Sequence, residues 1–343
     1  MQLPLTFKGA PGSPYTRKML AVLRYRRLPY ALLLPNAPQL KDLPTPKVEL
    51  LPTFYLQGAS GTIEAVTDST PLIRRFEAAF PERHVRPPDP ALAFLDSLLE
   101  DYADEWLTKA MFHYRWHYAD DTVKSAAILP RWRGITVSEA RATELGELFA
   151  KRQISRLAYV GSSPLTAPVI ESSYVRYLAA LDAHLNVHPF LLGGRPGAAD
   201  FAAYGQLTQL ALFDPTPAAL TLAKAPRVAA WTAIVDDLSG HGANEDQWIM
   251  RDAIPPTVID LLREVGRSYV PVMLANARAL KSGAARVECT VEGLPWVQNP
   301  FPYQAKCLAW LREEFTALDA AGGAAVRRIL AGTGCEALID AAI

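Results

Sequence analysis

A cluster of prolines divides the chain into two parts with different patterns. Residues 81–90 contain four prolines, Pro81, Pro87, Pro88 and Pro90. Proline fixes φ and disfavours helix at the residue before it, so this segment is expected to form a stiff, extended linker. Patterns of both strands and helices precede it, and helical patterns follow it. We therefore place a domain boundary here, and 343 residues suffice for two or three domains.

The pattern before the linker predicts a mixed α/β unit. Short apolar runs bounded by glycine or proline indicate strands, and apolar residues three and four apart indicate helices. Asp68 or Ser69 is a suitable cap for the last helix, with Pro71 in its first turn. The predicted elements are a strand at 3–7, a helix at 14–26, a strand at 30–34, strands at 53–56 and 62–66 that turn around Gly58 to Gly61, and a helix that ends at Phe80.

The residues after the linker have the spacing of helices. One face of a long helix would carry Leu92, Leu95, Leu99, Tyr102, Trp106 and Ala110. Further helices are predicted at 137–159, 167–186, 198–212, 226–238, 256–280, 303–319 and 323–340, with a break at 215–217 among others. A hairpin is predicted from 286–291 and 296–298, turning at Glu292 and Gly293. The predicted domains are 1–82, 90–240 and a C-terminal extension, 241–343.

Composition and spacing argue against several kinds of partner. The 35 basic and 35 acidic residues cancel, so nucleic acid and membrane surfaces are not expected as partners. The first residues lack the pattern of a signal peptide and no apolar run is long enough to span a bilayer, so we expect a cytoplasmic protein. Cys289, Cys307 and Cys335 lack metal-ligand spacing, and His113 and His117 lack an accompanying carboxylate motif, so no metal is expected.

Three segments, in this order, resemble the glutathione transferase family, in particular its bacterial members. They are Ser13-Pro14-Tyr15-Thr16-Arg17-Lys18, Leu51-Pro52-Thr53-Phe54 and Asp68-Ser69-Thr70-Pro71-Leu72-Ile73. A fourth similar segment runs from Leu191 to Gln206 and is followed by Ala225-Pro226-Arg227-Val228 and Trp231. The resemblance covers about residues 1–240. It implies an α/β thioredoxin-like N-terminal domain and an all-α C-terminal domain, here followed by a mostly helical extension that an ordinary family member lacks.

The resemblance implies a glutathione site built by the three N-terminal segments. Ser13, just before a helix, would donate a hydrogen bond to the glutathione thiolate, aided by the free N–H groups of the helix. Pro52 would follow a cis peptide bond, and the backbone of Leu51 would bind the peptide part of glutathione. Ser69 would hold the γ-glutamyl carboxylate at a helix N-terminus, and Asp68 would help to hold the amino group.

These residues also have ordinary structural interpretations. Ser13 is a suitable N-cap, which is compatible with catalysis, and Pro52 is also consistent with a trans proline at the start of a strand. Tyr15 is either an alternative hydroxyl donor or a packing residue. Arg17 and Lys18 are candidates for binding the ligand's carboxylates, or are solvated or ion-paired.

Two features of the helical part also have alternatives. The aromatic residues near the long helix have two interpretations. They pack in the core, which is more common for such helical stripes, or they stack on an apolar second substrate. They are Tyr102, Trp106, Tyr114 and Trp116. Gly197 stands three residues before Asp200, where the family often has a serine or threonine that forms a capping box. Since glycine offers no side-chain oxygen, this helix is expected to depend more on packing.

The leading hypothesis is a glutathione transferase that joins the glutathione thiolate to a small, hydrophobic electrophile, as in detoxification. Ser13 stands where some relatives have cysteine, which favours conjugation over mixed-disulfide chemistry. Glutathione-dependent isomerisation or dehalogenation would use the same site. The alternative from another class is a non-catalytic module that binds glutathione or a partner protein. A homodimer is expected from the family, and the extension would act as a lid or as a partner surface.

Overall fold

The computed structural model describes residues 1–58 and 60–340. Its N-terminal part contains a four-stranded sheet in the order β2-β1-β3-β4, in which β1 and β2 are parallel and the other pairs are antiparallel. The predicted order of elements is confirmed, although Ala59 in the expected turn lies outside the described residues. The elements are β1 (Leu5–Lys8), α1 (Pro14–Tyr25), β2 (Tyr30–Leu33), a short 3-10 helix (Pro38–Asp42), β3 (Thr53–Gln57), β4 (Ile63–Val66) and α2 (Ser69–Ala79).

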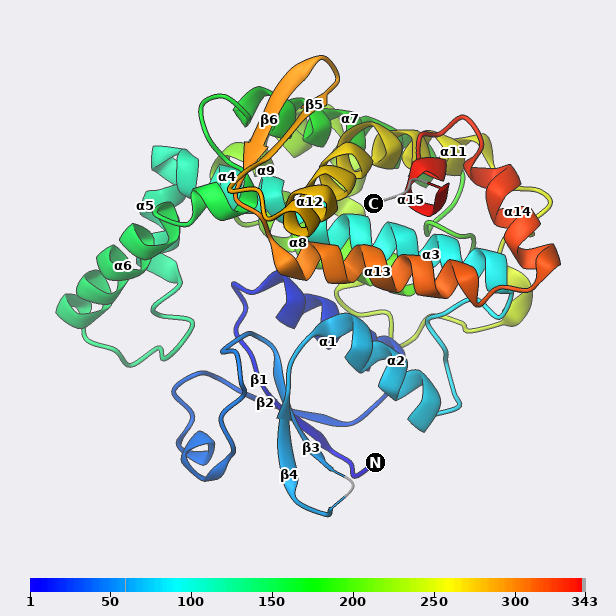
Figure 1. Ribbon diagram of the computed structural model, residues 1–343. Helices are drawn as coiled ribbons and strands as arrows, with labels where there is room; N and C mark the ends of the chain where they lie inside the picture. Colours follow the sequence, from blue (N-terminus) through cyan, green and yellow to red (C-terminus); the bar gives the residue numbers. More distant parts are fainter. Residues whose placement is uncertain (59, 341–343) are drawn as a thin grey trace.

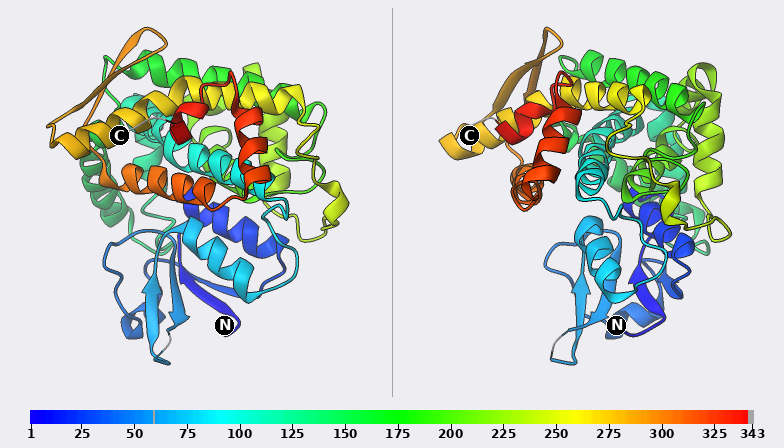
Figure 2. Two further views of the ribbon diagram at one scale, coloured as in Figure 1. Left: turned by 45° about the vertical axis from the view of Figure 1, so that its right-hand side comes forward. Right: turned by 90° about the vertical axis from the view of Figure 1, so that its right-hand side faces the viewer.

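Helices α1 and α2 lie between the sheet and the helical part of the molecule (Figures 1 and 2). The core beneath them is aromatic: Phe7 of β1 stacks on Phe54 of β3 at a centroid distance of 4.5 Å. Phe76 of α2 meets Phe54 edge-on at 5.4 Å. All three side chains are fully buried. Phe76 thereby packs α2 against the sheet.

The helical part begins after the linker. The predicted long helix is present as α3 (Pro90–Tyr102), a π-helical turn (Ala103–Leu107) and α4 (Thr108–His117). Every residue of α8 (Ala198–Leu210) is buried, so this helix forms the centre of the bundle. The remaining helices of this part are α5 (Ala119–Ile128), α6 (Glu139–Ile154), a 3-10 turn (Leu157–Val160), α7 (Ala167–Leu185), α9 (Pro215–Lys224) and α10 (Pro226–Val235).

The residues after 240 do not form a separate core. The Trp296 ring packs against the Trp106 ring at 5.2 Å, and one continuous hydrophobic core contains buried residues from both parts of the chain. In Figure 1, α13 crosses alongside α3. The elements here are a 3-10 turn (Glu245–Gln247), α11 (Pro256–Glu264), a π-helical turn (Val265–Tyr269), α12 (Val270–Ser282), β5 (Val287–Val291), β6 (Leu294–Gln298), α13 (Pro302–Thr316), α14 (Ala320–Leu330) and α15 (Glu336–Asp340).

These elements confirm an α/β thioredoxin-like domain followed by an all-α domain and a mostly helical extension, but three details differ from the predictions. The predicted break at 215–217 is wrong, because Pro215 occupies the first turn of α9, where proline is tolerated. The single helix at 323–340 is also wrong, since Gly332 and Gly334 take positive φ and separate α14 from α15. Helix α5 was not predicted, because its two buried residues, Asp121 and Ser125, are polar and leave no apolar stripe.

The start of α8 has a cap that sequence reasoning missed. Asp200 accepts hydrogen bonds from the N–H groups of Gly197 (2.8 Å) and Leu191 (2.9 Å). The oxygen that Gly197 lacks comes from α3, where Asp96 accepts from the N–H of Ala199 at 3.1 Å. A Cβ at Gly197 would lie 2.3 Å from this carboxylate oxygen, which explains the glycine. The start of α8 is therefore capped by a carboxylate of another helix. The expectation that α8 depends more on packing because it lacks a cap is wrong.

A second glycine sets the distance between the two parts of the molecule. Helix α8 packs closely against α1, and a Cβ added at Gly205 would lie 2.5 Å from the Pro14 carbonyl oxygen and 3.1 Å from Lys18 Cβ. Because the nearest atom is backbone, α1 would have to move to accept a methyl group. Gly205 therefore controls how closely the first turn of α1 approaches the helical part.

We expect Gly205→Ala to lower the free energy of unfolding by about 1–3 kcal/mol, the usual cost of overpacking, although alanine favours helix. The matched control is Gly323→Ala in α14, where the added Cβ meets nothing within 4 Å. This control should gain up to about 1 kcal/mol. Urea denaturation measures both, and equal gains in the two variants would contradict the close packing of α1 on α8.

Candidate functional site

Ser13 caps α1, the helix that follows the first strand. Its Oγ accepts a hydrogen bond from the N–H of Thr16 at 3.2 Å, and Pro14 occupies the first helical position. The same hydroxyl donates to the carbonyl oxygen of Leu51 at 3.2 Å. The Leu51–Pro52 peptide bond is cis. The structure thus brings together two of the predicted segments, with the hydroxyl proton of Ser13 directed at the Leu51 carbonyl.

The third predicted segment opens α2. Ser69 is its first residue and is only 5% exposed, and its Oγ accepts a hydrogen bond from Lys18 Nζ at 3.2 Å. Asp68 precedes it with a φ of +82°, and its Oδ2 accepts from the hydroxyl of Tyr303 at 2.9 Å. Burial raises the pKa of Asp68, while the Tyr303 hydrogen bond and the charge of Lys18 act in the opposite direction. An extension residue therefore reaches the predicted site.

Lys18 joins the starts of α1 and α2 to the helical part. Its ammonium group is completely buried and also donates to Glu100 Oε1 at 2.7 Å and Asp104 Oδ2 at 2.5 Å. Burial acts to lower the pKa of Lys18, but the two carboxylates outweigh it and the net shift is upward. Burial raises the pKa of Asp104 to about 7, although Lys18 opposes this. With all three donors used, Lys18 holds the site together and does not reach a ligand's carboxylate.

Tyr15 and Arg17 are also engaged with the protein. The Tyr15 hydroxyl donates to the backbone carbonyl of Asp104 at 2.8 Å, and burial raises its pKa well above the usual value. Arg17 Nε donates to the Pro11 carbonyl at 3.3 Å, and its Nη1 lies 3.5 Å from a carboxylate oxygen of Asp236. In this structure the two side chains thus support α1 and the loop before it.

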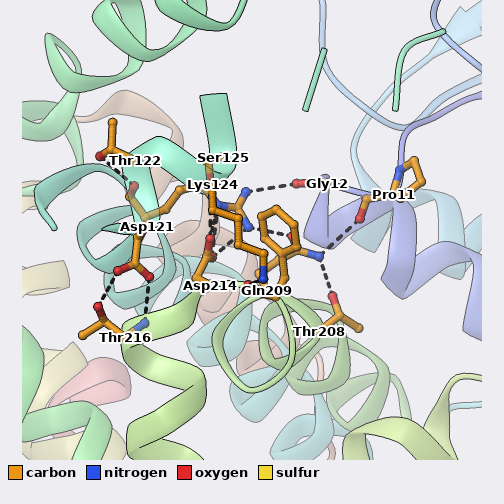
Figure 3. Close-up of polar contacts among 12 residues, drawn as sticks. Pro11, Gly12, Asp121, Thr122, Lys124, Ser125, Thr208, Gln209, Asp214 and Thr216 are labelled. Atoms are coloured by element: carbon orange, nitrogen blue, oxygen red, sulfur yellow. Dashed lines mark hydrogen bonds and ion pairs between the residues drawn. The ribbon is translucent and has the colours of Figure 1, made fainter. Parts of the chain in front are cut away.

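The loop before Ser13 is held by residues that the sequence did not single out. Figure 3 shows Gln209 of α8 reaching Pro11, and its Nε2 lies 3.3 Å from the Pro11 carbonyl oxygen. Arg115 of α4 donates to the Gly12 carbonyl at 3.2 Å and forms a buried ion pair with Asp214 at 2.9 Å. These contacts join residues roughly a hundred or more positions apart, so no local pattern could have revealed them. They fix the backbone that presents Ser13.

The aromatic residues of the long helix belong to the core. Tyr102, Trp106, Tyr114 and Trp116 are each only 2–3% exposed. The packing interpretation therefore accounts for them, and stacking on a second substrate would need other residues. Within residues 1–58 and 60–340, no cluster of three histidine, cysteine or acidic side chains has the arrangement of a metal site. Over the same residues, no helix is both long and apolar enough to cross a membrane.

Two family models match this chain, in the order of the two domains. The model described as "Glutathione S-transferase, N-terminal domain" matches residues 7–84, and "Glutathione S-transferase, C-terminal domain" matches residues 151–233. The first match contains Ser13, Leu51, Pro52 and Ser69, and Tyr303 lies outside both. No curated protein matches the chain by sequence.

Solved structures of glutathione transferases are similar to the chain at low identity. One, from Methylobacterium radiotolerans in complex with glutathione sulfonate, is 19% identical, with a TM-score of 0.37 over 72% of this chain and 97% of its own. One from Rhodospirillum rubrum is 18% identical, with a TM-score of 0.40 over 68% and 89%. A Tau class enzyme from mango, Mangifera indica, is 18% identical, with a TM-score of 0.39 over 75% and 95%. Because these TM-scores are low, we draw no conclusion about the site from the solved structures. The comparison rests on the two family models.

We expect a large effect on stability from Lys18→Met. The variant leaves Glu100 and Asp104 buried without their cation, so the free energy of unfolding should fall by about 3–5 kcal/mol. Without Lys18 the folded-state pKa of Asp104, which is already raised, rises further, and that of Glu100, which Lys18 helps to hold below its usual value, rises as well. A raised folded-state pKa of an acid removes stability as pH rises, so the deficit relative to the wild type should grow from about pH 4 to 7.

Chemical denaturation across that pH range measures this effect, with Lys47→Met as the control because Lys47 is exposed. The control should stay within about 0.5 kcal/mol of the wild type. A Lys18→Met variant as stable as this control, with no dependence on pH, would show that the buried ion cluster does not hold the site together.

Proposed function

We propose that this chain, which belongs to the glutathione transferase superfamily, binds glutathione and transfers it to a small, hydrophobic electrophile. The observation that carries this proposal is the hydrogen bond from Lys18 to Ser69, which links the helix that Ser13 caps to the start of α2. Helix α1 presents the Ser13 hydroxyl beside the Leu51 carbonyl, and α2 begins at Ser69, while Lys18 ties α1 to Ser69. A thiol and a carboxylate are the two ligand groups that such helix ends stabilise.

In the proposed reaction, glutathione lies between the two helix ends. Ser69 and the free N–H groups at the start of α2 hold the γ-glutamyl carboxylate, and Asp68 accepts from the ammonium group. At α1, the helix N-terminus and the Ser13 hydroxyl favour the thiolate, whose proton is lost to water. The thiolate sulfur then bonds to the electrophilic carbon, and the electron pair of the broken bond leaves with the departing group or moves within the substrate.

The contact between Ser13 and Leu51 suggests how the ligand prepares its own site. A hydroxyl has one proton, and Ser13 now donates it to the Leu51 carbonyl. In the proposal, an amide N–H of bound glutathione replaces Ser13 at this carbonyl. The released hydroxyl then turns to the sulfur without breaking the cap of α1, because its lone pairs still accept from Thr16.

A second candidate function is a non-catalytic module that binds glutathione or a partner protein. It is favoured by a specific observation, namely that the three polar side chains of the site already have partners within the protein. Ser13 bonds Leu51, Ser69 bonds Lys18, and Asp68 bonds Tyr303. If these contacts persist when glutathione is bound, the thiol gains no donor. Isomerisation and dehalogenation use the same glutathione site and differ from conjugation only in the electrophile.

We also propose a cellular compartment, a role and an oligomeric state for this chain. Glutathione is kept as a free thiol in the cytosol, so we place this chain there, with detoxification of electrophiles as its role. We also propose a homodimer. Light scattering during size exclusion should then give a mass twice that of the 37.6 kDa chain, and a mass of one chain at all concentrations would contradict the dimer.

Calorimetric titration of glutathione tests the binding part of this proposal. Ser69→Ala removes a hydroxyl at the carboxylate end, so the dissociation constant should rise at least about tenfold. The control is Ser155→Ala, since Ser155 is exposed and its hydroxyl donates to the nearby carbonyl of Arg152. The absence of binding to the wild type at millimolar glutathione would overturn the proposal.

The thiolate absorbance of bound glutathione tests the catalytic part. The pKa of the bound thiol should lie below that of free glutathione in the wild type and should rise in Ser13→Ala, because a donor to the thiolate is lost. An unchanged thiol pKa in Ser13→Ala, combined with normal binding, would favour the non-catalytic candidate.

A further inference from the structure

Helix α13 of the C-terminal extension contacts the N-terminal part at two places on either side of a cavity. At one end, the Tyr303 hydroxyl donates to Asp68. At the other end, Glu314 forms ion pairs with Arg74 of α2 and Arg86 of the linker. A cavity of about 450 Å³ lies between them, bounded by α2, α3 and α13. The extension therefore passes over α2 (Figures 1 and 2) and leaves this cavity between them.

We propose that Tyr303 is a positioning residue of the glutathione site, which holds the Asp68 carboxylate so that its other oxygen can accept from the γ-glutamyl ammonium group. This inference rests on the proposed function and goes beyond the predicted site, which contains residues of the N-terminal part alone. It gives the extension a role in recognising the ligand.

The backbone of Asp68 supports this role. Its φ of +82° is uncommon for a residue with a side chain, and strained backbone of this kind tends to cluster at functional sites. Although Asp68 stands at the N-cap position, its side chain accepts no hydrogen bond from the N–H groups of α2 within the part of the chain that the structure describes. The carboxylate is turned to Tyr303 instead, and the first N–H groups of α2 are left for a ligand.

Tyr303 is itself placed by buried contacts. The completely buried Asn276 of α12 donates to the Phe301 carbonyl at 2.9 Å and accepts from the Phe301 N–H at 2.8 Å. One residue beyond Tyr303, the buried Gln304 accepts from Gln298 Nε2 at 3.2 Å. The first turn of α13 is therefore fixed on both sides of Tyr303, so the contact with Asp68 is built into the fold.

The surroundings of Asp68 determine what the Tyr303 hydrogen bond does. Burial raises the pKa of Asp68 first of all, and Glu100 of α3 raises it further. Tyr303 and Lys306 of α13 and Lys18 of α1 lower it. A phenol that donates to the carboxylate therefore favours the ionised form, which is the form that binds an ammonium group. It also restricts the rotation of the carboxylate, so that one oxygen stays free for the ligand.

The test uses Tyr303→Phe in the full-length protein, because this change removes only the hydroxyl. Glutathione affinity should fall about tenfold, the value of one hydrogen bond to a charged group. Since the pKa of Asp68 rises in the variant, the loss of affinity on acidification should begin at a higher pH than in the wild type. The control is Tyr159→Phe, an exposed tyrosine on the surface of the helical part.

Two further measurements separate a positioning role from a purely structural one. A glutathione analogue that lacks the γ-glutamyl amino group should bind the wild type and Tyr303→Phe equally well, because Asp68 then has nothing to hold. In an Asp68→Asn background, Tyr303→Phe should cause no further loss, since Tyr303 acts through Asp68. If Tyr303→Phe does not fold, Tyr303→Leu is used with the same two ligands.

The outcomes distinguish this inference from the proposed function. If the wild type does not bind glutathione, the proposed function itself fails. If the wild type binds and Tyr303→Phe binds with the same affinity and pH dependence, the hydrogen bond merely attaches the extension and the inference is overturned. Equal losses for glutathione and for the analogue would also overturn it, because they would show a general disturbance of the site.

Discussion

The arrangement of the site depends on one buried ammonium group. Lys18 of α1 donates to Ser69 at the start of α2 and to Glu100 and Asp104 of the helical part. An ammonium group with three donors can satisfy three acceptors, and removing it would leave two buried carboxylates without their cation. Helix α1 and the start of α2 are therefore held together by a contact within the protein, without help from a ligand.

Other parts of the site are also held by residues that are distant in the sequence. The loop before Ser13 is held by Arg115 and Gln209 of the helical part, and Asp68 is held by Tyr303 of the extension. The extension in turn shares the hydrophobic core through Trp106 and Trp296. Three regions of the chain thus contribute contacts around the predicted site.

Sequence alone could predict the features that are local. The helix starts at Ser13-Pro14 and at Asp68-Ser69 could be predicted, because cap chemistry depends on neighbouring residues. The cis bond before Pro52 was expected only from the family resemblance, since local chemistry also allowed a trans proline. The order of strands and most of the helices followed from periodicity for the same reason. Whether these residues bind glutathione stays a prediction that binding measurements must decide.

The rest could not be predicted because its partners are far apart along the chain. Nothing near Lys18 indicates that it is buried, and nothing near Tyr303 indicates that it meets a residue 235 positions away. The cap at Gly197 could not be predicted either, because the acceptor oxygen comes from Asp96 of another helix. Spacing reports which faces are apolar, whereas the pairing of buried polar groups depends on how those faces are assembled.

The most direct test of the central claim, that the two helix N-termini form one glutathione site, is a titration of isotope-labelled protein followed by backbone amide resonances. The account predicts that glutathione shifts the amides of Leu51 and Ser69 together, with a single saturating dissociation constant, and that the amide of Tyr303 follows the same curve. Amides at Leu51 and Ser69 that do not move at millimolar glutathione, or that move with different constants, would contradict it.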